Sequence, residues 1–281
     1  MKRVLTIQDI SCLGKCSLTV ALPLISSMGV EAVILPTAVL STHTMFKGFT
    51  VKDLADQIVP ITEHWKKEGV KFDAICTGYL GTEDEIDMVK QIFRDFRTEN
   101  NLIFVDPAMG DNGKLYPAFD EHYAKKNAEL CAFADVIVPN ITEAAYMTGT
   151  EYRDSYDEAY VKDLLQKLAA LGAKTVVLTG VSLSEGKTGV MGLDSATGEY
   201  FSYQNDRIPK SYHGTGDIFS SVAAGALMNG LSLADSMKLA ADYTARTIAV
   251  TMENPSDPWY GVDFETTIPY LVKTLEEMKQ A

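Results

Sequence analysis

The sequence predicts an α/β protein: a three-layer α/β/α fold with a mostly parallel central sheet. Short apolar runs alternate with amphipathic stretches from the N-terminus to about residue 180, which is typical of βαβ units. The runs are almost continuously apolar, as expected of strands that helices cover on both faces. No internal repeat and no low-complexity segment interrupts the alternation, so we expect a single domain over residues 1–281.

The expected strands are the apolar runs, and the expected helices are the amphipathic stretches between them. The strands are Arg3–Gln8, Glu31–Pro36, Phe72–Thr77, Leu102–Asp106, Val136–Pro139 and Thr175–Thr179. The helices are Ser17–Met28, Val51–Glu68, Asp84–Glu99, Phe119–Phe133 and Ser155–Leu171. Thr37–Thr50 has no clean helical period, and we expect a short β excursion or a flap there.

The pattern changes after Thr179. Lys187–Asp194 and Gly198–Gln204 are predicted to form a hairpin, with its turn over Asp194–Gly198. Three helices are expected to follow, over Asp217–Asn229, Ser232–Met252 and Phe264–Lys279.

The composition limits the partners and the location. The chain has 25 Lys and Arg against 38 Asp and Glu, a formal net charge of −13, which argues against nucleic acid or an anionic membrane surface as the main partner. The longest charge-free run, Ile218–Ala234, is shorter than the ~20 apolar residues of a membrane-spanning helix. The N-terminus enters the first strand without the pattern of a signal peptide, so we expect a cytoplasmic protein. Of the four cysteines, Cys76 and Cys131 are expected in the core.

Polar residues and glycines follow the predicted strands. Ligands of parallel α/β sheets bind outside the carboxyl ends of the strands. The candidates there are Asp9, Ser11, Thr42, His43, Thr44, Gly78, Tyr79, Asp106, Asp111, Asn140, Glu143, Thr179 and Gly180.

The segment His213-Gly214-Thr215-Gly216-Asp217 precedes a helix rich in small residues. Two glycines before a helix leave its first N–H groups accessible and let an anion approach closely. The alternative is that Asp217 only caps the helix or complements its dipole.

Two further segments carry oxygen ligands at strand ends. Asp106 ends a buried strand before Pro107, and Asn140 and Glu143 follow another strand. Such oxygens suit Mg²⁺, which binds through few carboxylates together with water and substrate phosphates. The structural alternative is a capping box over Asn140 and Glu143.

Six segments in this order resemble the pyridoxal kinase family of the ribokinase-like superfamily. They are Gln8-Asp9, Ser41-Thr42-His43-Thr44, Thr77-Gly78-Tyr79-Leu80-Gly81, Asp106-Pro107-Ala108-Met109-Gly110, Pro139-Asn140-Ile141-Thr142-Glu143 and Gly214-Thr215-Gly216-Asp217. The resemblance runs from about Val4 to about Ala249, and six segments in order are far more specific than any one of them. It implies a ribokinase-like fold and ATP-dependent phosphorylation of the hydroxymethyl group of pyridoxal, pyridoxine or pyridoxamine.

The resemblance also implies roles for individual residues. Asp217 would be the general base, and the backbone of Gly214, Thr215 and Gly216 would form an anion hole over the transferred phosphoryl group. The remaining roles are ATP binding by Asp106, Asn140, Glu143 and Thr179, Mg²⁺ binding by Asp106 and Glu143, and substrate binding by Asp9, His43, Thr44 and Tyr79. A monovalent cation and a homodimer are further expectations from the family.

This sequence departs from the family pattern at Asp9, where many pyridoxal kinases have Ser. Asp9-Ile10-Ser11 and Thr37-Ala38-Val39-Leu40 resemble hydroxymethylpyrimidine kinases, although those relatives commonly carry Cys where this chain has Asp217. The alternatives are therefore a hydroxymethylpyrimidine (phosphate) kinase or a non-catalytic pyridoxal-binding relative. The retention of Asp217 and both glycines argues against the second.

Overall fold

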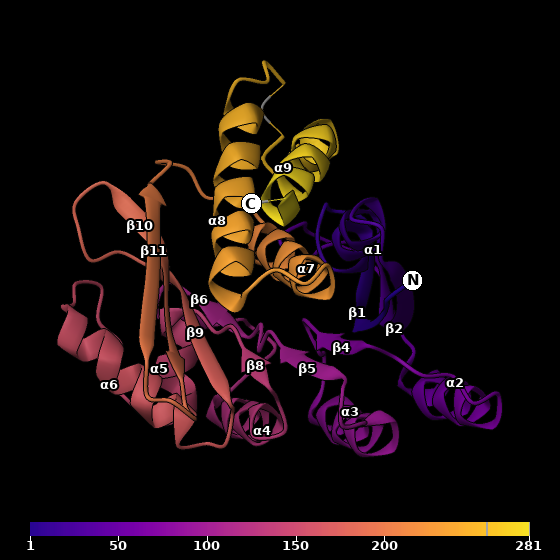
Figure 1. Cartoon of the computed structure of the whole chain (residues 1–281). Helices are drawn as coiled ribbons and strands as arrows, with labels where there is room; N and C mark the ends of the chain where they lie inside the picture. Colours follow the sequence, from indigo (N-terminus) through magenta and orange to yellow (C-terminus); the bar gives the residue numbers. More distant parts are fainter. Residues whose placement is uncertain (257, 281) are drawn as a thin grey trace.

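The computed structural model describes residues 1–256 and 258–280, and its core is a nine-stranded sheet (Figure 1). The strand order is β11-β10-β9-β8-β5-β4-β1-β2-β3. Six strands are parallel: β1 (Arg3–Leu13), β2 (Glu31–Thr42), β4 (Ala74–Thr77), β5 (Leu102–Val105), β8 (Val136–Ile137) and β9 (Thr175–Val181). β3 (Val51–Asp53) pairs antiparallel with β2, and the hairpin β10 (Lys187–Asp194) and β11 (Tyr200–Asp206) extends the other edge.

Helices cover both faces of the sheet, which confirms the predicted three layers (Figure 1). One face carries α1 (Leu18–Ser27), α7 (Thr215–Met228), α8 (Leu233–Met252) and α9 (Ile268–Gln280). The other carries α2 (Ala55–Lys67), α3 (Glu83–Phe96), α4 (Glu121–Cys131), α5 (Ile141–Thr148) and α6 (Glu158–Ala169). None of these helices is long and apolar enough to cross a membrane, within residues 1–256 and 258–280.

The strands supply side chains to two apolar clusters. Successive residues of a strand point to opposite faces, so Val4 belongs to the cluster under α1 and α7, whereas Leu5 belongs to the cluster under α3 and α4. Cys76 and Cys131 are buried in these clusters, as predicted. Burial on both faces explains why the strands are continuous apolar runs in the sequence.

Three predicted boundaries are wrong in a way that affects the site. β1 continues to Leu13 and β2 to Thr42, so Asp9 lies inside a strand and Thr37–Thr50 is partly the end of β2. The predicted helix over Val51–Glu68 begins only at Ala55, because Val51–Asp53 pairs with β2. Since β2 itself shifts register after Pro36, which cannot donate a ladder hydrogen bond, this corner of the sheet is irregular.

Other elements were not predicted. The helix α5 begins directly after Asn140, and a two-residue hairpin, β6 (Gly110–Asp111) and β7 (Lys114–Leu115), follows β5. The predicted C-terminal helix starts as a 3₁₀ turn, Phe264–Thr267, before α9. The other predicted helices agree with the structure to within a few residues.

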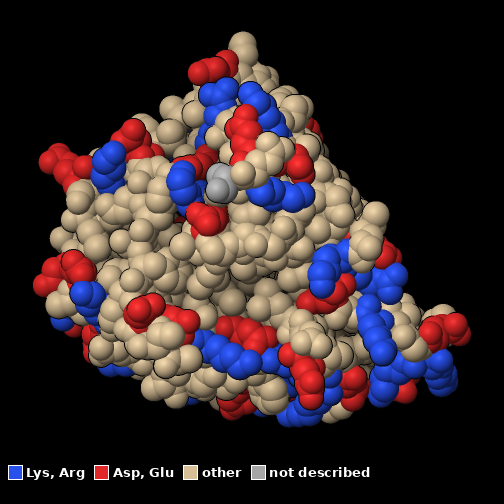
Figure 2. Space-filling view, in the orientation of Figure 1, with Lys and Arg blue, Asp and Glu red and all other residues tan. Residues whose placement is uncertain are grey.

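Charged side chains are distributed mainly around the rim of the face seen in Figure 1. Figure 2 shows that the middle of this face is mostly uncharged, with Lys and Arg interspersed among Asp and Glu toward the edges. This face therefore carries no broad basic patch.

Candidate active site

The carboxyl ends of β1, β4 and β5 and the first turns of α7 enclose a small crevice. Gln8, Gly78, Asp106 and Asp217 line it. β1 pairs with β4 only from Val4 to Ile7, so the rest of β1 extends beyond β4 and leaves this side open. Sequence positions as far apart as 8 and 217 thus meet where the strand-end rule predicts a ligand.

The start of α7 requires glycine at one position and leaves space at another. Gly214 is the N-cap with a left-handed φ of 82°, and a Cβ there would lie 2.1 Å from the carbonyl oxygen of Lys15. A Cβ on Gly216 would meet no atom within 4 Å. No side chain caps this helix, so no capping group occupies its first N–H groups, and Gly216 beside them borders open space.

Asp217 lies in the first turn of α7 and is partly buried. Its carboxylate accepts a hydrogen bond from the backbone N–H of Ser17. Burial, and then the negative charges of Asp106 and Asp9, raise the pKa of Asp217 to about 7. A carboxyl group with that pKa can accept a proton near neutral pH, as a general base must.

Asp106 is linked to the same helix. The Ser220 hydroxyl, one turn after Asp217, donates to Asp106 Oδ2 over 2.6 Å. Burial raises the pKa of Asp106, and the Ser220 hydrogen bond opposes that rise. Asp106 and Asp217 thus face one crevice from opposite sides, with like charges close together.

Asn140 and Glu143 form the capping box that the sequence allowed as a structural alternative. Asn140 Oδ1 accepts from the N–H of Glu143 over 3.0 Å, and Glu143 Oε2 accepts from the N–H of Asn140 over 2.8 Å. Glu143 Oε1 also accepts from the N–H of Met109 over 3.0 Å, and the Asn140 amide donates to the Gly110 carbonyl. Both side chains therefore tie α5 to the segment that follows Asp106.

Glu143 is a buried carboxyl with an acidic neighbour. It is only 3% exposed, and burial followed by the charge of Asp106 raises its pKa. The pKa of Asp106 is raised as well. Two such carboxyl groups favour a cation between or beside them, because a positive charge would lower the pKa values of both.

Thr179 lies next to Asn140 at the end of the sheet. The two residues form an isolated parallel bridge, and the N–H of Thr179 donates to the carbonyl of Pro139 over 2.9 Å. The structure thus brings Asp106, Asn140, Glu143 and Thr179, the residues expected to bind ATP, to neighbouring strand ends.

His43 is more buried than a residue that simply lines an open pocket. It is 2% exposed, its Nδ1 accepts from the N–H of Met45, and its Nε2 contacts the carbonyl of Tyr260 at 2.8 Å. Since Nδ1 is the acceptor, Nε2 carries the proton and donates to Tyr260. Burial lowers the pKa of His43, so the neutral form is favoured. Thr44, next to it, is exposed.

Aromatic rings from three separate segments surround His43. The centroid of its ring is 4.1 Å from that of His213 and 4.9 Å from that of Phe46, and Phe46 lies 4.6 Å from Trp259. The loop after β2, the segment before α7 and the segment after α8 thus pack together at the edge of the site.

Asp9 lies near enough to both His43 and Tyr79 to influence their pKa values. Asp9 is 4% exposed and accepts hydrogen bonds from the hydroxyls of Ser11 and Ser17, while burial raises its pKa. Burial and then the charge of Asp9 raise the pKa of Tyr79 to about 12. Tyr79 is partly buried, and its ring centroid is 5.3 Å from that of Phe119.

Two residues at the site were not foreseen. Ser17 donates its N–H to Asp217 and its hydroxyl to Asp9, and Ser220 donates to Asp106. The serine that follows Asp217 by three positions could have been noticed, because residues i and i+3 share a helix face. Ser17 carried no such signal, because its position depends on an unusual backbone φ of 50°.

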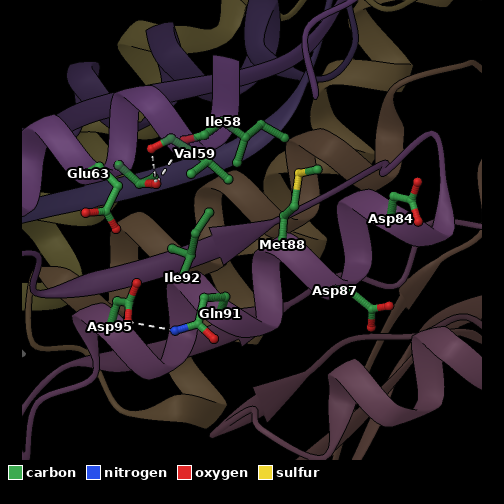
Figure 3. A pocket seen from close by; sticks show the side chains of 10 residues that line it. Ile58, Val59, Glu63, Asp84, Asp87, Met88, Gln91, Ile92 and Asp95 are labelled. Atoms are coloured by element: carbon green, nitrogen blue, oxygen red, sulfur yellow. Dashed lines mark hydrogen bonds between the residues drawn. The ribbon is translucent and has the colours of Figure 1, made fainter. Parts of the chain in front are cut away.

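A larger hollow lies away from this site. It is a groove of about 370 Å³ between α2 and α3, with an apolar floor and acidic residues at its edge (Figure 3). The apolar residues are Ile58, Val59, Met88 and Ile92, and the acidic ones are Glu63, Asp84, Asp87 and Asp95. None of the residues predicted to bind substrate or ATP lines this groove.

Comparison with known proteins places the chain among kinases. The family model described as phosphomethylpyrimidine kinase matches residues 22–257. A crystal structure of a Bacteroides thetaiotaomicron protein assigned as a phosphomethylpyrimidine kinase is 38% identical, with a TM-score of 0.93 over 96% of this chain and 93% of that one. A second crystal form of that protein contains pyridoxal.

Enzymes named as pyridoxal kinases are also similar. The crystal structure of pyridoxal kinase from Lactobacillus plantarum is 32% identical, with a TM-score of 0.90 over 99% of both chains. Pyridoxal kinase from Dictyostelium discoideum is 28% identical over 79% of this chain and 77% of that protein. The chain therefore belongs to the phosphomethylpyrimidine kinase family, and within it this ribokinase-like protein is a kinase of the pyridoxal kinase type.

Proposed function

We propose that the protein transfers the γ-phosphoryl group of ATP to the 5′-hydroxymethyl group of pyridoxal, pyridoxine or pyridoxamine. The observation that carries the proposal is Asp217, a carboxylate whose pKa is raised to about 7, beside the uncapped N-terminus of α7. Phosphoryl transfer needs a positioned base and stabilisation of charge on the transferred group, and this one turn of helix supplies both.

In the proposed reaction, Asp217 accepts the proton of the hydroxymethyl group as its oxygen attacks the γ-phosphorus. The bond from that phosphorus to the β–γ bridging oxygen breaks, and ADP leaves with the electron pair. The N–H groups around Gly214, Thr215 and Gly216 donate to the oxygens of the transferred group, where the open space beside Gly216 gives room for them. The raised pKa of Asp217 suits it to hold this proton until the product leaves.

Mg²⁺ is proposed to bind at Asp106 and Glu143, with Asn140 and water completing contacts to the ATP phosphates. The raised pKa values of both carboxyl groups support a cation there. Within the described part of the chain no three His, Cys, Asp or Glu side chains form a metal cluster. Mg²⁺ does not need one, because waters and phosphate oxygens usually supply most of its ligands. When bound, the ion would neutralise the phosphate charge.

Asp9, His43, Thr44 and Tyr79 are proposed to bind the substrate ring, and Thr179 the nucleotide. Asp9 also supports the second candidate, a hydroxymethylpyrimidine kinase, because a buried carboxylate can accept a hydrogen bond from an amino group. The pyridoxal-containing form of the 38% identical Bacteroides protein supports pyridoxal, pyridoxine or pyridoxamine as the substrate.

The remaining expectations follow from the family resemblance. The protein is proposed to work as a single domain and a homodimer, with a monovalent cation as an additional requirement. A cytoplasmic location is supported by the four cysteines, which are all free thiols in the structure.

A coupled assay for ADP formation tests the proposed function. It offers ATP with pyridoxal, pyridoxine, pyridoxamine or hydroxymethylpyrimidine, each with and without Mg²⁺ and with K⁺ or Na⁺. We expect the largest kcat/KM for a B6 vitamer and little turnover without Mg²⁺. Turnover of hydroxymethylpyrimidine alone would establish the second candidate, and no turnover of any of them would reject both.

A further inference from the structure

The loop between β1 and α1, residues 14–17, adopts a backbone that its residues do not favour. Lys15 has a φ of 49° and Ser17 a φ of 50°, and residues other than glycine, Asn and Asp seldom adopt a positive φ. Such conformations persist where surrounding contacts hold them. The contacts around this β1–α1 loop therefore indicate which part of the structure its conformation serves.

Ser17 connects the loop to two carboxylates of the site. Its backbone N–H donates to Asp217, and its side chain hydrogen-bonds Asp9. The β1–α1 loop thus carries the backbone donor of Asp217.

Lys15 anchors the same loop to the C-terminal part of the chain. Its Nζ lies 2.7 Å from Asp263 Oδ1 and 3.0 Å from Glu265 Oε2. The side chains of Lys15 and Asp263 are only 19% and 16% exposed, so this ion pair is better shielded from solvent than a surface pair. Asp263 is itself fixed, because its carboxylate accepts from the Asn254 amide over 2.6 Å.

The loop also fits tightly against glycines of both partner segments, through the Lys15 carbonyl on one side and the Lys15 side chain on the other. A Cβ on Gly214 would lie 2.1 Å from the Lys15 carbonyl oxygen, and a Cβ on Gly261 would lie 2.6 Å from Lys15 Cβ. The β1–α1 loop is therefore enclosed between the start of α7 and the segment before α9. A movement at Lys15 would reach the N-cap of α7 directly.

We propose that Lys15 is a positioning residue, whose ion pairs hold the β1–α1 loop so that Ser17 keeps its hydrogen bond to Asp217. Lys15 acts on the base through the loop and touches neither substrate nor nucleotide. This inference rests on the proposed role of Asp217.

The test breaks the ion pair from each side, with Lys15→Met, Asp263→Asn and the double variant. Lys15→Met keeps the length of the side chain and leaves Asp263 bonded to Asn254, so the variant should fold. A misplaced base typically costs between about tenfold and about a hundredfold in rate, and we expect such a fall in kcat for pyridoxal with both KM values little changed. The double variant should be no slower than Lys15→Met, because both changes remove one interaction.

Lys90→Met is the matched control, and Lys15→Arg is the rescue. Lys90 on α3 also pairs with two carboxylates, Glu129 at 2.6 Å and Asp87 at 3.1 Å, and its side chain is 8% exposed. We expect Lys90→Met to lower the melting temperature without changing kcat, and Lys15→Arg to retain most of the wild-type kcat. Equal kcat values for Lys15→Met and Lys90→Met would overturn the proposal. A rise in KM at constant kcat would also overturn it, since Lys15 would then contact a substrate.

The amide proton shift of Ser17 in ¹⁵N-labelled protein separates this inference from the proposed function. An N–H that donates to a carboxylate resonates downfield, so Lys15→Met should move the Ser17 signal upfield, and Lys90→Met should not. This measurement needs no turnover. An unchanged Ser17 signal in Lys15→Met rejects the positioning role of Lys15, even if Asp217 is the base. If the signal moves but Asp217→Asn keeps full activity, Asp217 is not the base, and Lys15 still positions Ser17.

Discussion

The helices α5 and α7 start at the same edge of the sheet, each with an acidic residue in its first turn, but their N-termini differ. In α5, Asn140 and Glu143 satisfy each other's backbone in a closed capping box. In α7, the N-cap is Gly214, which has no side chain, and Asp217 takes its hydrogen bond from Ser17 on another segment. The closed terminus fixes structure, and the open terminus leaves N–H groups for an anion.

The difference separates two uses of the same chemical group. Glu143 is 3% exposed and accepts backbone hydrogen bonds at both oxygens, so its first task is to hold α5 against the segment after Asp106. Asp217 is partly exposed at the crevice, and like charges from Asp106 and Asp9 raise its pKa. The buried carboxylate with complete hydrogen bonds organises the site, and the partly exposed one with a raised pKa beside open space can react.

The largest expected effect on stability comes from the two glycines of the open terminus. Gly214→Ala forces a Cβ against the Lys15 carbonyl at a φ of 82°, so stability should fall by roughly 1–3 kcal/mol or more, and activity with it. Gly216→Ala meets no neighbour and should raise stability by about 0.5–1 kcal/mol, as Gly→Ala does within helices. Its methyl group should nevertheless lower kcat, because it enters the space proposed for the phosphoryl group. Thermal melts and kcat measure both; full turnover in Gly216→Ala would place the phosphoryl group elsewhere.

The closed terminus is tested by Glu143→Gln. The amide keeps the shape, but its NH₂ cannot accept the second backbone N–H, so stability should fall by about 1–3 kcal/mol. Loss of the charge should also raise the Mg²⁺ concentration for half-maximal activity much more than the KM for pyridoxal. Asp157→Ala, which removes the cap of α6, is the control: it should lower stability alone. Identical Mg²⁺ titrations in wild type and Glu143→Gln would leave Glu143 with only its capping role.

The pH dependence of stability sharpens the comparison further. The pKa of Asp217 is raised from an ordinary 3.8 to about 7, so the folded protein holds this proton over a range where the unfolded chain has lost it. Ionisation of Asp217 therefore lowers the stability of the folded protein as pH rises from about 4 to about 7, and the full loss of stability persists at higher pH. Asp217→Asn should raise the melting temperature at pH 8 by more than at pH 5. An equal change at both values would mean that the carboxyl group has an ordinary pKa.

The smallest expected effect concerns Asp9, on the substrate side. Asp9→Ser restores the residue common in pyridoxal kinases and removes a buried carboxylate near His43. The ratio of kcat/KM values among pyridoxal, pyridoxamine and hydroxymethylpyrimidine should change, with the amino substrates losing most. A uniform fall for all three would show that Asp9 serves the structure of β1.

The strands were predictable because burial on both faces leaves a plain apolar run, and the strand-end rule then located Asp106, Asn140 and Glu143. Asp217 was found in another way, from the two glycines that precede its helix. The strand β3 was missed because Val51–Asp53 continues the amphipathic pattern of α2, and only pairing with β2 makes it a strand. The hairpin of β6 and β7 is too short, at two residues a strand, to have a period.

Contacts that depend on tertiary geometry could not be predicted from the sequence. His43 was placed at the substrate by resemblance, yet its burial beside His213 and Tyr260 depends on segments about 170 and 217 positions away. The hydrogen bond from Ser17 to Asp217 depends on the conformation of the β1–α1 loop, in which Lys15 and Ser17 have a positive φ that their residue types do not predict. Sequence patterns thus predict which groups reach the site, whereas the partners that orient those groups require the fold.

Single-turnover phosphorylation of pyridoxal by Asp217→Asn, with excess enzyme and saturating Mg²⁺–ATP, tests the role of the open helix terminus most directly. Positioned proton transfer contributes ~10²–10⁴-fold, so the rate should fall by about that factor while the variant stays folded and binds ATP at least as well as the wild type. A folded, ATP-binding Asp217→Asn with a wild-type single-turnover rate would contradict the account, because the base would then lie elsewhere.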